Sequence, residues 1–283
     1  MKTETIDRYT HSLNKVLSYI EKNSNEPQTL EQLAKVGGFS KYHFTGIFQA
    51  LLGESPISYL RRIRLERAAF RLKLNHESVT DIALSSGFET NAAFSKSFRK
   101  RFNTTPSELI KNFQQSVSSI KLTKPEIITL PDTKVLFVKE IGNLNNATDK
   151  AWLKLFVYAY KLRRKSKINL LGKNVQRFGI VHDDPDITSE DKIRYDACIS
   201  YQGDGIAVGK QINIKTIAGG RYASFLHIGP LEGIKAVCDS IKYWMIDNDV
   251  KLKDAPIFHR YLDIDTRKVK PEDLRSEVCV PLT

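Results

Sequence analysis

The chain has 283 residues, enough for two domains of ordinary size that each bury an apolar core. Lys and Arg outnumber Asp and Glu by 44 to 32, and the resulting net charge of +12 favours a polyanionic partner. The N-terminus lacks the apolar segment of a signal peptide, and no apolar run approaches the ~18 residues of a membrane span, so we expect a cytoplasmic protein without a membrane partner.

The cysteines and short motifs give no sign of catalysis. Cys198, Cys238 and Cys279 are far apart, odd in number and outside any C-x-x-C spacing, so we interpret them as reduced thiols. The sequence contains no HExxH, P-loop, dinucleotide-binding glycine motif or Ser-His-Asp order. We therefore predict no metal, no cofactor and no catalytic residue.

One phrase in the first part of the chain occurs twice. GGFSKYHFTGIFQALLGESP, from Gly37 to Pro56, returns in looser form as SGFETNAAFSKSFRKRFNTTP, from Ser86 to Pro106. Each copy has a Gly-Phe turn, a helix with apolar residues at i, i+4 and i+8, a residue that tolerates the left-handed conformation, and a Pro. A short apolar stripe precedes each turn, and Thr29 offers a capping box before the first one. Each copy therefore predicts a helix, a tight turn and a second helix.

The segment between the two copies reads as a rigid connector. Ile57 to Leu74 contains no Pro or Gly, so a helix of about 18 residues would span roughly 27 Å. Successive major-groove faces of B-DNA lie about 34 Å apart, so such a connector could hold two helices in adjacent grooves. The same segment carries five arginines: Arg61, Arg62, Arg64, Arg67 and Arg71.

From about Thr10 to Asn112 the sequence resembles the DNA-binding domain of AraC-type transcription regulators, most of all the MarA, SoxS and Rob group. The similarity lies in SLNKVLSYIEKN, TLEQLAKVGGFSKYHFTGIF, SYLRRIRLERAAFRL and VTDIALSSGFETNAAFSKSFRKRFNTTPSEL. It implies an all-α domain over residues 8–113 with two helix-turn-helix units. Such a domain binds double-stranded DNA, and two units in one chain allow it to do so as a monomer.

The resemblance also implies which residues face DNA. Helices Ser40–Leu52 and Asn91–Phe102 should enter successive major grooves. The residues expected at DNA are Lys41, Tyr42, Thr45, Gly46, Gln49, Asn91, Ala92, Ser95, Lys96 and Arg99, with Arg61 on the connector. Related regulators often carry long polar side chains where this chain has Thr45 and Gly46, so the first helix should rely more on shape and phosphate contacts. The alternative for each residue is a solvated helix face, and the connector arginines are interpreted as structural or phosphate-facing.

Beyond a polar linker at residues 114–124 the pattern changes to short alternating runs over 125–283. KVLFVKEI, FGIVH, YDACISY, INIKTI, RYASFLHI, FHRYL and SEVCVPL predict strands. Two helices are expected among them, Thr148–Lys167 with Thr148 as its cap and Pro230–Asp247 after a Gly-Pro start. This order predicts an α+β domain made of two similar strand-helix-strand halves.

The phrase RYASFLHIGPLEGI, the Tyr195-Asp196 pair and a Glu before VCVP resemble the GyrI-like small-molecule-binding domain. Such domains hold ligands, commonly cationic and aromatic, in a cleft with an acid at its base. The resemblance implies Glu277 as that acid, because a carboxylate and aromatic faces both attract an organic cation. The rings expected around it are Trp152, Phe156, Tyr222, Trp244 and Tyr261, with a place in the core as the alternative for each.

We therefore predict a multidomain transcription regulator that binds DNA through its N-terminal domain and a small-molecule effector through its C-terminal domain, and that is not an enzyme. Three alternatives stay open. The C-terminal domain could be ligand-silent. It could hydrolyse a small molecule with Glu277 and either Tyr222 or His227 as acid and base. It could also be a protein-interaction module that contacts RNA polymerase or another regulator.

Overall fold

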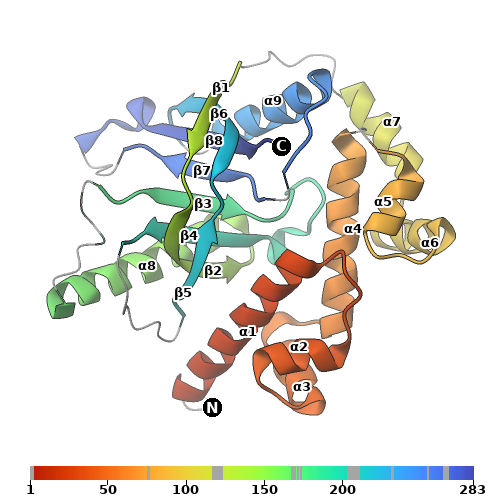
Figure 1. Cartoon of the computed structure of the whole chain (residues 1–283), viewed down its shortest axis with the longest axis horizontal. Helices are drawn as coiled ribbons and strands as arrows, with labels where there is room; N and C mark the ends of the chain where they lie inside the picture. The colour runs from red at the N-terminus through yellow and green to blue at the C-terminus, as the bar shows by residue number, and fades with distance from the viewer. Residues whose placement is uncertain are drawn as a thin grey trace. The chain divides into compact units, whose positions relative to one another are not determined.

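The structure is a computed structural model of the chain, shown in Figure 1. It describes residues 3–74, 77–116, 124–166, 170, 172, 174–202, 211–230, 233–253, 255–263 and 268–283. The chain divides into two compact units, Met1–Ser118 and Ser119–Val208 with Ile212–Thr283, and each is considered by itself. Within the described ranges, no helix is long and apolar enough to cross a membrane.

The first unit is helical, as the repeated phrase predicts. Its helices are α1 (Thr3–Asn23), α2 (Leu30–Gly37), α3 (Lys41–Leu52), α4 (Pro56–Leu74), α5 (Val79–Ser85), α6 (Asn91–Phe102) and α7 (Pro106–Ser116). The helix-turn-helix units are α2–α3 and α5–α6, and α4 connects them. Because α7 continues to Ser116, it enters the segment expected as a linker, and residues 117–123 of that segment lie outside the described residues.

The helix boundaries follow local chemistry. Thr29 and Gln32 form the expected capping box at the start of α2. Gly38, Gly53 and Asn103 end α2, α3 and α6 with φ of 73°, 72° and 54°, the left-handed region that Gly and Asn tolerate best. Ser40 precedes α3, but its side chain makes no capping hydrogen bond. The repeated turn chemistry therefore sets the same helix ends in both copies.

Each repeat has its own aromatic core. The rings of Phe44 and Phe48 lie 5.4 Å apart in the first copy, and those of Phe94 and Phe98 lie 5.4 Å apart in the second. All four side chains are buried. The i, i+4 spacing places these rings on one face of α3 and one face of α6, which leaves the opposite faces exposed.

The second unit is an antiparallel sheet with two long helices. The strands are β1 (Glu126–Leu130), β2 (Thr133–Ile141), β3 (Arg177–Val181), β4 (Arg194–Ser200), β5 (Asn213–Ile217), β6 (Gly220–Ile228), β7 (Phe258–Tyr261) and β8 (Arg275–Pro281). The helices are α8 (Leu144–Ser166) and α9 (Ile234–Asp247), with short 3-10 turns at Glu190–Lys192 and Pro271–Asp273. The strand order is β1-β6-β8-β7-β3-β4-β2-β5.

The strand order confirms two similar halves. In each half two strands precede a helix and two follow it, and the first strand of each half pairs with the other half: β1 with β6, and β5 with β2. Leu155 on α8 packs on the β2–β4 side, and Trp244 on α9 packs on Phe225 of β6. By strand register Phe225 points to the same face as the residues beneath α8, so both helices cover one face of the sheet.

Three details differ from the sequence expectations. First, α8 begins at Leu144 rather than at Thr148, because the side chain of Asn143 accepts a hydrogen bond from the backbone N–H of Asn146 and caps the helix one turn earlier. The expected last residue, Lys167, lies outside the described residues. Second, α9 begins at Ile234 rather than at Pro230. Third, β1 was not predicted, because it is an edge strand that buries little apolar surface.

Candidate nucleic-acid interface and ligand site

The outward face of α3 carries little charge. Tyr42 is 88% exposed, and Gly46 and Gln49 are also exposed. Thr45 is half-buried, and its hydroxyl donates to the backbone carbonyl of Lys41 at 2.9 Å, within its own helix. The surface that α3 offers is thus built mainly from an aromatic ring, an amide and open backbone at a glycine.

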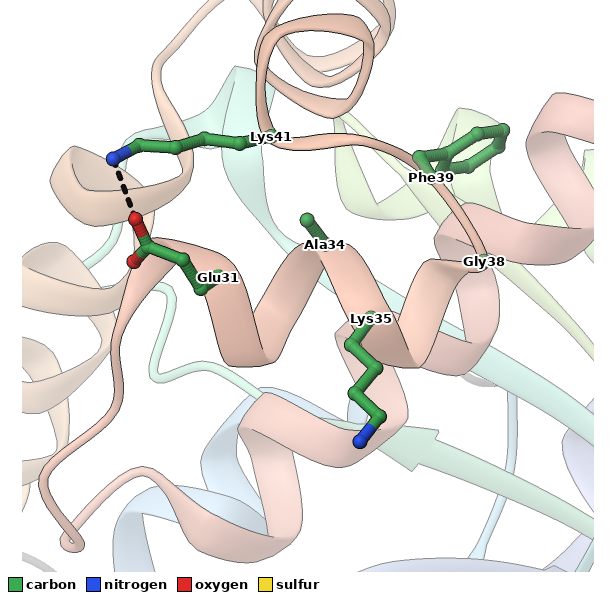
Figure 2. Close-up of a pocket in the computed structure, with 6 residues that line it drawn as sticks. All are labelled: Glu31, Ala34, Lys35, Gly38, Phe39 and Lys41. Carbon is green, nitrogen blue, oxygen red and sulfur yellow. Dashed lines mark hydrogen bonds and ion pairs between the residues drawn. The ribbon is translucent and has the colours of Figure 1, made fainter.

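The one basic residue expected at this surface is paired inside the unit. Lys41 Nζ lies 2.5 Å from Glu31 Oε1 across a pocket of about 360 Å³, and Figure 2 shows the two side chains meeting above α2. The hydrogen bond lowers the pKa of Glu31 and raises the pKa of Lys41, so both are ionised at neutral pH. Both side chains are exposed, so Lys41 remains within reach of a phosphate that competes with Glu31.

The outward face of α6 is basic. Asn91, Ala92, Lys96 and Arg99 are exposed, and Ser95 is half-buried. Ser95 donates to the side-chain oxygen of Asn91 at 3.3 Å, which orients the Asn91 amide at the start of the helix. Lys and Arg suit phosphates and guanine acceptors, and Asn suits adenine, so this face can make charged and base-specific contacts.

The arginines of α4 serve mainly inside the unit. Arg61 is exposed, whereas Arg64 donates to the backbone carbonyls of Ser24 and Glu26 at 2.6 and 2.7 Å. Arg67 donates to the Ser24 hydroxyl and Arg71 binds Glu77. These bonds tie α4 to the α1–α2 loop and to the residue Glu77 just before α5, and Arg71 also donates to the Ser85 hydroxyl on α5. Of the five arginines, Arg61 is the one with an exposed side chain, and the others agree with the prediction of a structural role.

The second unit contains an aromatic cluster beneath α8. Trp152 Nε1 donates to the Tyr195 hydroxyl at 2.9 Å, and the hydroxyls of Tyr195 and Tyr261 lie 3.1 Å apart. The Trp152 ring stacks on Phe156 at 5.2 Å and meets Tyr261 edge-on at 5.5 Å. Burial raises the pKa of both tyrosines, so they are neutral hydrogen-bonding groups. Three of the rings expected at the ligand site thus lie together, joined by Tyr195.

A glycine makes room for this cluster. A Cβ atom at Gly179 would lie 2.5 Å from the Tyr195 hydroxyl oxygen and 2.7 Å from that of Tyr261. Any side chain at Gly179 would force both hydroxyls to move, because a Cβ atom and a hydroxyl oxygen cannot lie this close together. Tyr195 and Gly179 were not predicted as site residues, although the Tyr195-Asp196 pair drew attention in the sequence.

Strand register separates Glu277 from the cluster. Tyr261 pairs with Ser276, whereas Glu277 pairs with Arg260, and successive residues of a strand point to opposite faces. Glu277 therefore lies on the face away from α8, where its carboxylate is 2.5 Å from Arg260. The structure does not bring Glu277 and the Trp152 rings around one cavity.

The two remaining rings lie apart from the cluster. Tyr222 is buried on the Glu277 face, 5.2 Å from the Phe258 ring, and its hydroxyl donates to the Ala218 carbonyl. Trp244 packs edge-on against Phe225 beneath α9 at 5.2 Å. His227 Nε2 meets the Pro230 carbonyl oxygen at 3.0 Å. The groups named for a hydrolase, Glu277, Tyr222 and His227, are thus each engaged in other bonds.

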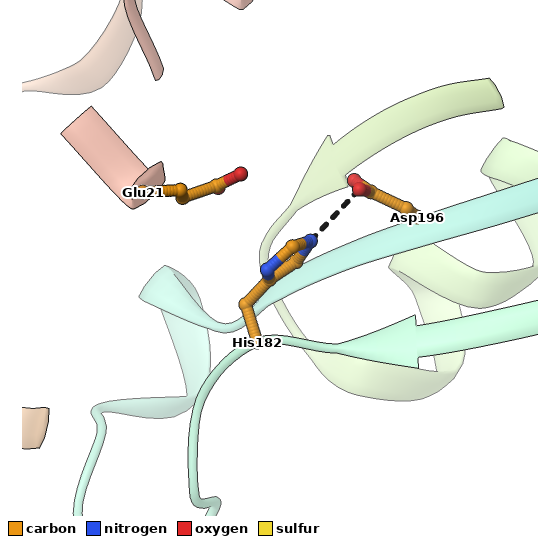
Figure 3. A group of neighbouring side chains, drawn as sticks. All are labelled: Glu21, His182 and Asp196. Carbon is orange, nitrogen blue, oxygen red and sulfur yellow. Dashed lines mark hydrogen bonds and ion pairs between the residues drawn. The ribbon is translucent and has the colours of Figure 1, made fainter. Parts of the chain in front are cut away.

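A buried ionic group that sequence reasoning missed lies on the same face as Glu277. Asp196 Oδ1 is 2.7 Å from Lys139 Nζ, and both side chains are 1% exposed. Figure 3 shows the His182 ring turned toward Asp196, with Nε2 2.8 Å from Oδ2, and Lys215 contacts the same oxygen. Burial alone would raise the pKa of Asp196, but Lys139 and Lys215 hold it well below the usual range. The signal in the sequence was an Asp inside the apolar run YDACISY.

Comparison with known proteins agrees with this architecture. A model of the GyrI-like small molecule binding domain matches residues 123–283, and a helix-turn-helix domain model matches residues 33–112. The chain belongs to the GyrI-like family and is an AraC-type DNA-binding transcription regulator. Its expected two-part organisation is thereby confirmed at the level of the fold and family.

Similar proteins cover nearly the whole chain or only part of it. The transcriptional regulator Rob of Salmonella typhimurium is 24% identical over 94% of this chain and 96% of its own length. The probable transcription factor PqrA of Proteus vulgaris is 36% identical over 35% of this chain and 84% of its own length. Among solved structures, the EcmrR–DNA complex is 17% identical with a TM-score of 0.49, covering 95% of this chain and 94% of that chain.

Proposed function

We propose that the first unit reads one DNA duplex with α3 and α6 in successive major grooves. The observation that carries this proposal is the exposure of equivalent positions in the two repeats, such as Gly46 with Lys96 and Gln49 with Arg99, while the aromatic cores face inward. The 19 residues of α4 span about 28 Å, close to the separation of about 34 Å between successive groove faces.

Selection of binding sites from a random duplex library by the full chain tests this proposal. The expected product is a non-palindromic site with two unlike submotifs about one helical turn apart. Selection at near-physiological salt limits binding through phosphates alone. Enrichment of one submotif, or of a palindrome, would contradict the arrangement of two grooves and one chain.

We propose further that the aromatic cluster beneath α8 is the effector site and that it takes a flat aromatic compound. Trp152 and Phe156 supply stacking faces, and the Tyr195 and Tyr261 hydroxyls supply donors and acceptors at one edge. Ser276, at the strand position beside Tyr261, adds a buried hydroxyl that has no hydrogen-bond partner among the described residues. A cationic ligand at Glu277 would have to displace Arg260, which makes that carboxylate the second candidate.

Tryptophan fluorescence separates these two candidates. The chain has two tryptophans, so Trp244→Phe leaves Trp152 as the reporter at the cluster. In that background, a panel of flat aromatic compounds, cationic and neutral, should quench Trp152, and Tyr261→Ala should weaken binding about 10-fold or more. Glu277→Gln should leave binding unchanged. The opposite pattern would place the effector at Glu277, and no saturable response in the Trp244→Phe protein would favour a ligand-silent domain.

A further inference from the structure

Four side chains of alternating charge cross the first unit from the end of α3 to the end of α6. Glu54 follows the residue that ends α3, Arg62 and Glu66 lie one turn apart on α4, and Arg101 lies in the last turn of α6. Arg62 Nη2 donates to Glu54 Oε1 at 2.8 Å, and Arg62 Nη1 donates to Glu66 Oε2 at 3.0 Å. Arg101 Nη2 donates to the other Glu66 oxygen at 2.8 Å. We call these four residues the ion-pair network.

The centre of the ion-pair network is buried. The side chains of Arg62 and Glu66 are 6% and 4% exposed, and the Arg62 guanidinium lies 4.8 Å from the centre of the Tyr59 ring. A buried ion pair adds little net stability compared with apolar side chains, because desolvation offsets the attraction. Its contribution is a constraint on the relative positions of the two side chains, because an arginine and a carboxylate form good hydrogen bonds only over a narrow range of distances and angles. The ion-pair network therefore restrains the relative positions of the helices more than it stabilises the fold.

From this arrangement we infer that Glu66 and Arg101 are positioning residues that set the separation and angle of α6 relative to α3. The inference deepens the two-groove proposal and rests on it. One added base pair moves the second groove by about 3.4 Å along the duplex and by about 34° around it. If the ion-pair network fixes α6 on α4, the protein should bind duplexes with spacers of the wrong length more weakly, because α6 cannot follow the displaced groove.

The test measures binding of the full chain to a series of duplexes that differ only in spacer length. The two selected submotifs are kept, and the spacer is varied by one and two base pairs in each direction. Arg101→Met removes the tie between α4 and α6 but leaves Glu66 paired with Arg62, so the variant is expected to fold. Wild-type protein should discriminate between spacers, and Arg101→Met should reduce that discrimination about fivefold, the scale of coupling between contacting groups. Arg101→Lys should restore part of it.

Lys100→Met is the matched control. Lys100 is the exposed neighbour of Arg101 on the same helix, so its replacement removes one positive charge and leaves the ion-pair network intact. Both Met variants should lose overall affinity through weaker phosphate contacts, but the control should keep the wild-type spacer profile. A thermal melt of each variant verifies that the fold is intact.

The outcomes separate the inference from the proposal beneath it. If the affinity of Arg101→Met alone depends less on spacer length than that of wild type, positioning by the ion-pair network is supported. An unchanged profile in Arg101→Met, with clear spacer discrimination by wild type, overturns the inference and leaves the two-groove proposal standing. Equal binding of wild type to every spacer overturns both. Equal flattening by Lys100→Met also overturns the inference, because loss of charge alone would then explain the effect.

Discussion

The two helix-turn-helix units share a scaffold but differ in the surface they offer. Both bury two phenylalanines one turn apart, and both end their second helix with a residue of positive φ. On the exposed face, Gly46 and Gln49 of α3 occupy the positions of Lys96 and Arg99 of α6, since the second copy follows the first by 50 residues. The apolar pattern thus serves the fold in both copies, whereas the polar pattern gives each copy a different exposed surface.

Under the two-groove proposal, this difference implies a division of labour at DNA. In the two-groove proposal the cationic face of α6 would supply most of the phosphate attraction, whereas α3 would meet DNA through Tyr42, Gln49 and close approach at Gly46. The comparison can be tested where the copies agree, in their cores, and where they differ, on their surfaces and caps.

The largest effect is expected where the copies agree. Phe48→Ala and Phe98→Ala each delete a fully buried ring, so each should lower the free energy of unfolding by about 3–5 kcal/mol. Urea unfolding of the full chain, followed by circular dichroism, gives both values. Losses below about 1 kcal/mol in either variant would contradict a separate packed core in each repeat.

A smaller effect is expected on the surfaces, where the copies differ. The double variant Lys96→Ala with Arg99→Ala should weaken DNA binding about 10- to 100-fold and reduce the salt dependence by about two phosphate contacts. Thr45→Ala with Gln49→Ala, an uncharged double variant on the same face of α3, should change sequence preference and leave the salt slope as in wild type. Fluorescence anisotropy over a salt series measures both, and equal slopes for the two doubles would remove the division of labour.

The smallest effect concerns the helix caps. The Thr90 hydroxyl accepts a hydrogen bond from the Ala93 N–H at 3.1 Å, whereas Ser40 makes no such bond at the equivalent place before α3. Thr90→Ala should therefore lower stability by about 1 kcal/mol, and Ser40→Ala should change it by a few tenths at most. Paired urea titrations decide the point, and a larger loss for Ser40→Ala would reverse the comparison.

The parts of the fold that the sequence predicted depend on local chemistry. Gly38, Gly53 and Asn103 mark helix ends because few other residues tolerate positive φ, and the apolar periodicity identifies the cores. The start of α8 was missed because Thr148 and Asn143 are both competent caps, and the choice depends on which turn packs against the sheet.

The parts that could not be predicted depend on long-range pairing. The carbonyls of Ser24, Glu26 and Glu21 that accept from Arg64 and Arg67 lie 38 to 46 positions earlier in the chain, so a run of arginines alone does not show that it is internal. The candidate ligand site depends on register: pairing Tyr261 with Ser276 puts Glu277 on the other face, and a shift of one residue would reverse this. The sequence could name the aromatic rings but not the side of the sheet to which each belongs.

Hydroxyl-radical footprinting of a selected site, with the number of bound chains measured in the same complex, tests the central claim most directly. The account predicts one chain per duplex and two protected patches about one helical turn apart, with a stronger salt dependence at the patch assigned to α6. A single patch per chain, or two chains on one site, would contradict the placing of α3 and α6 in successive grooves.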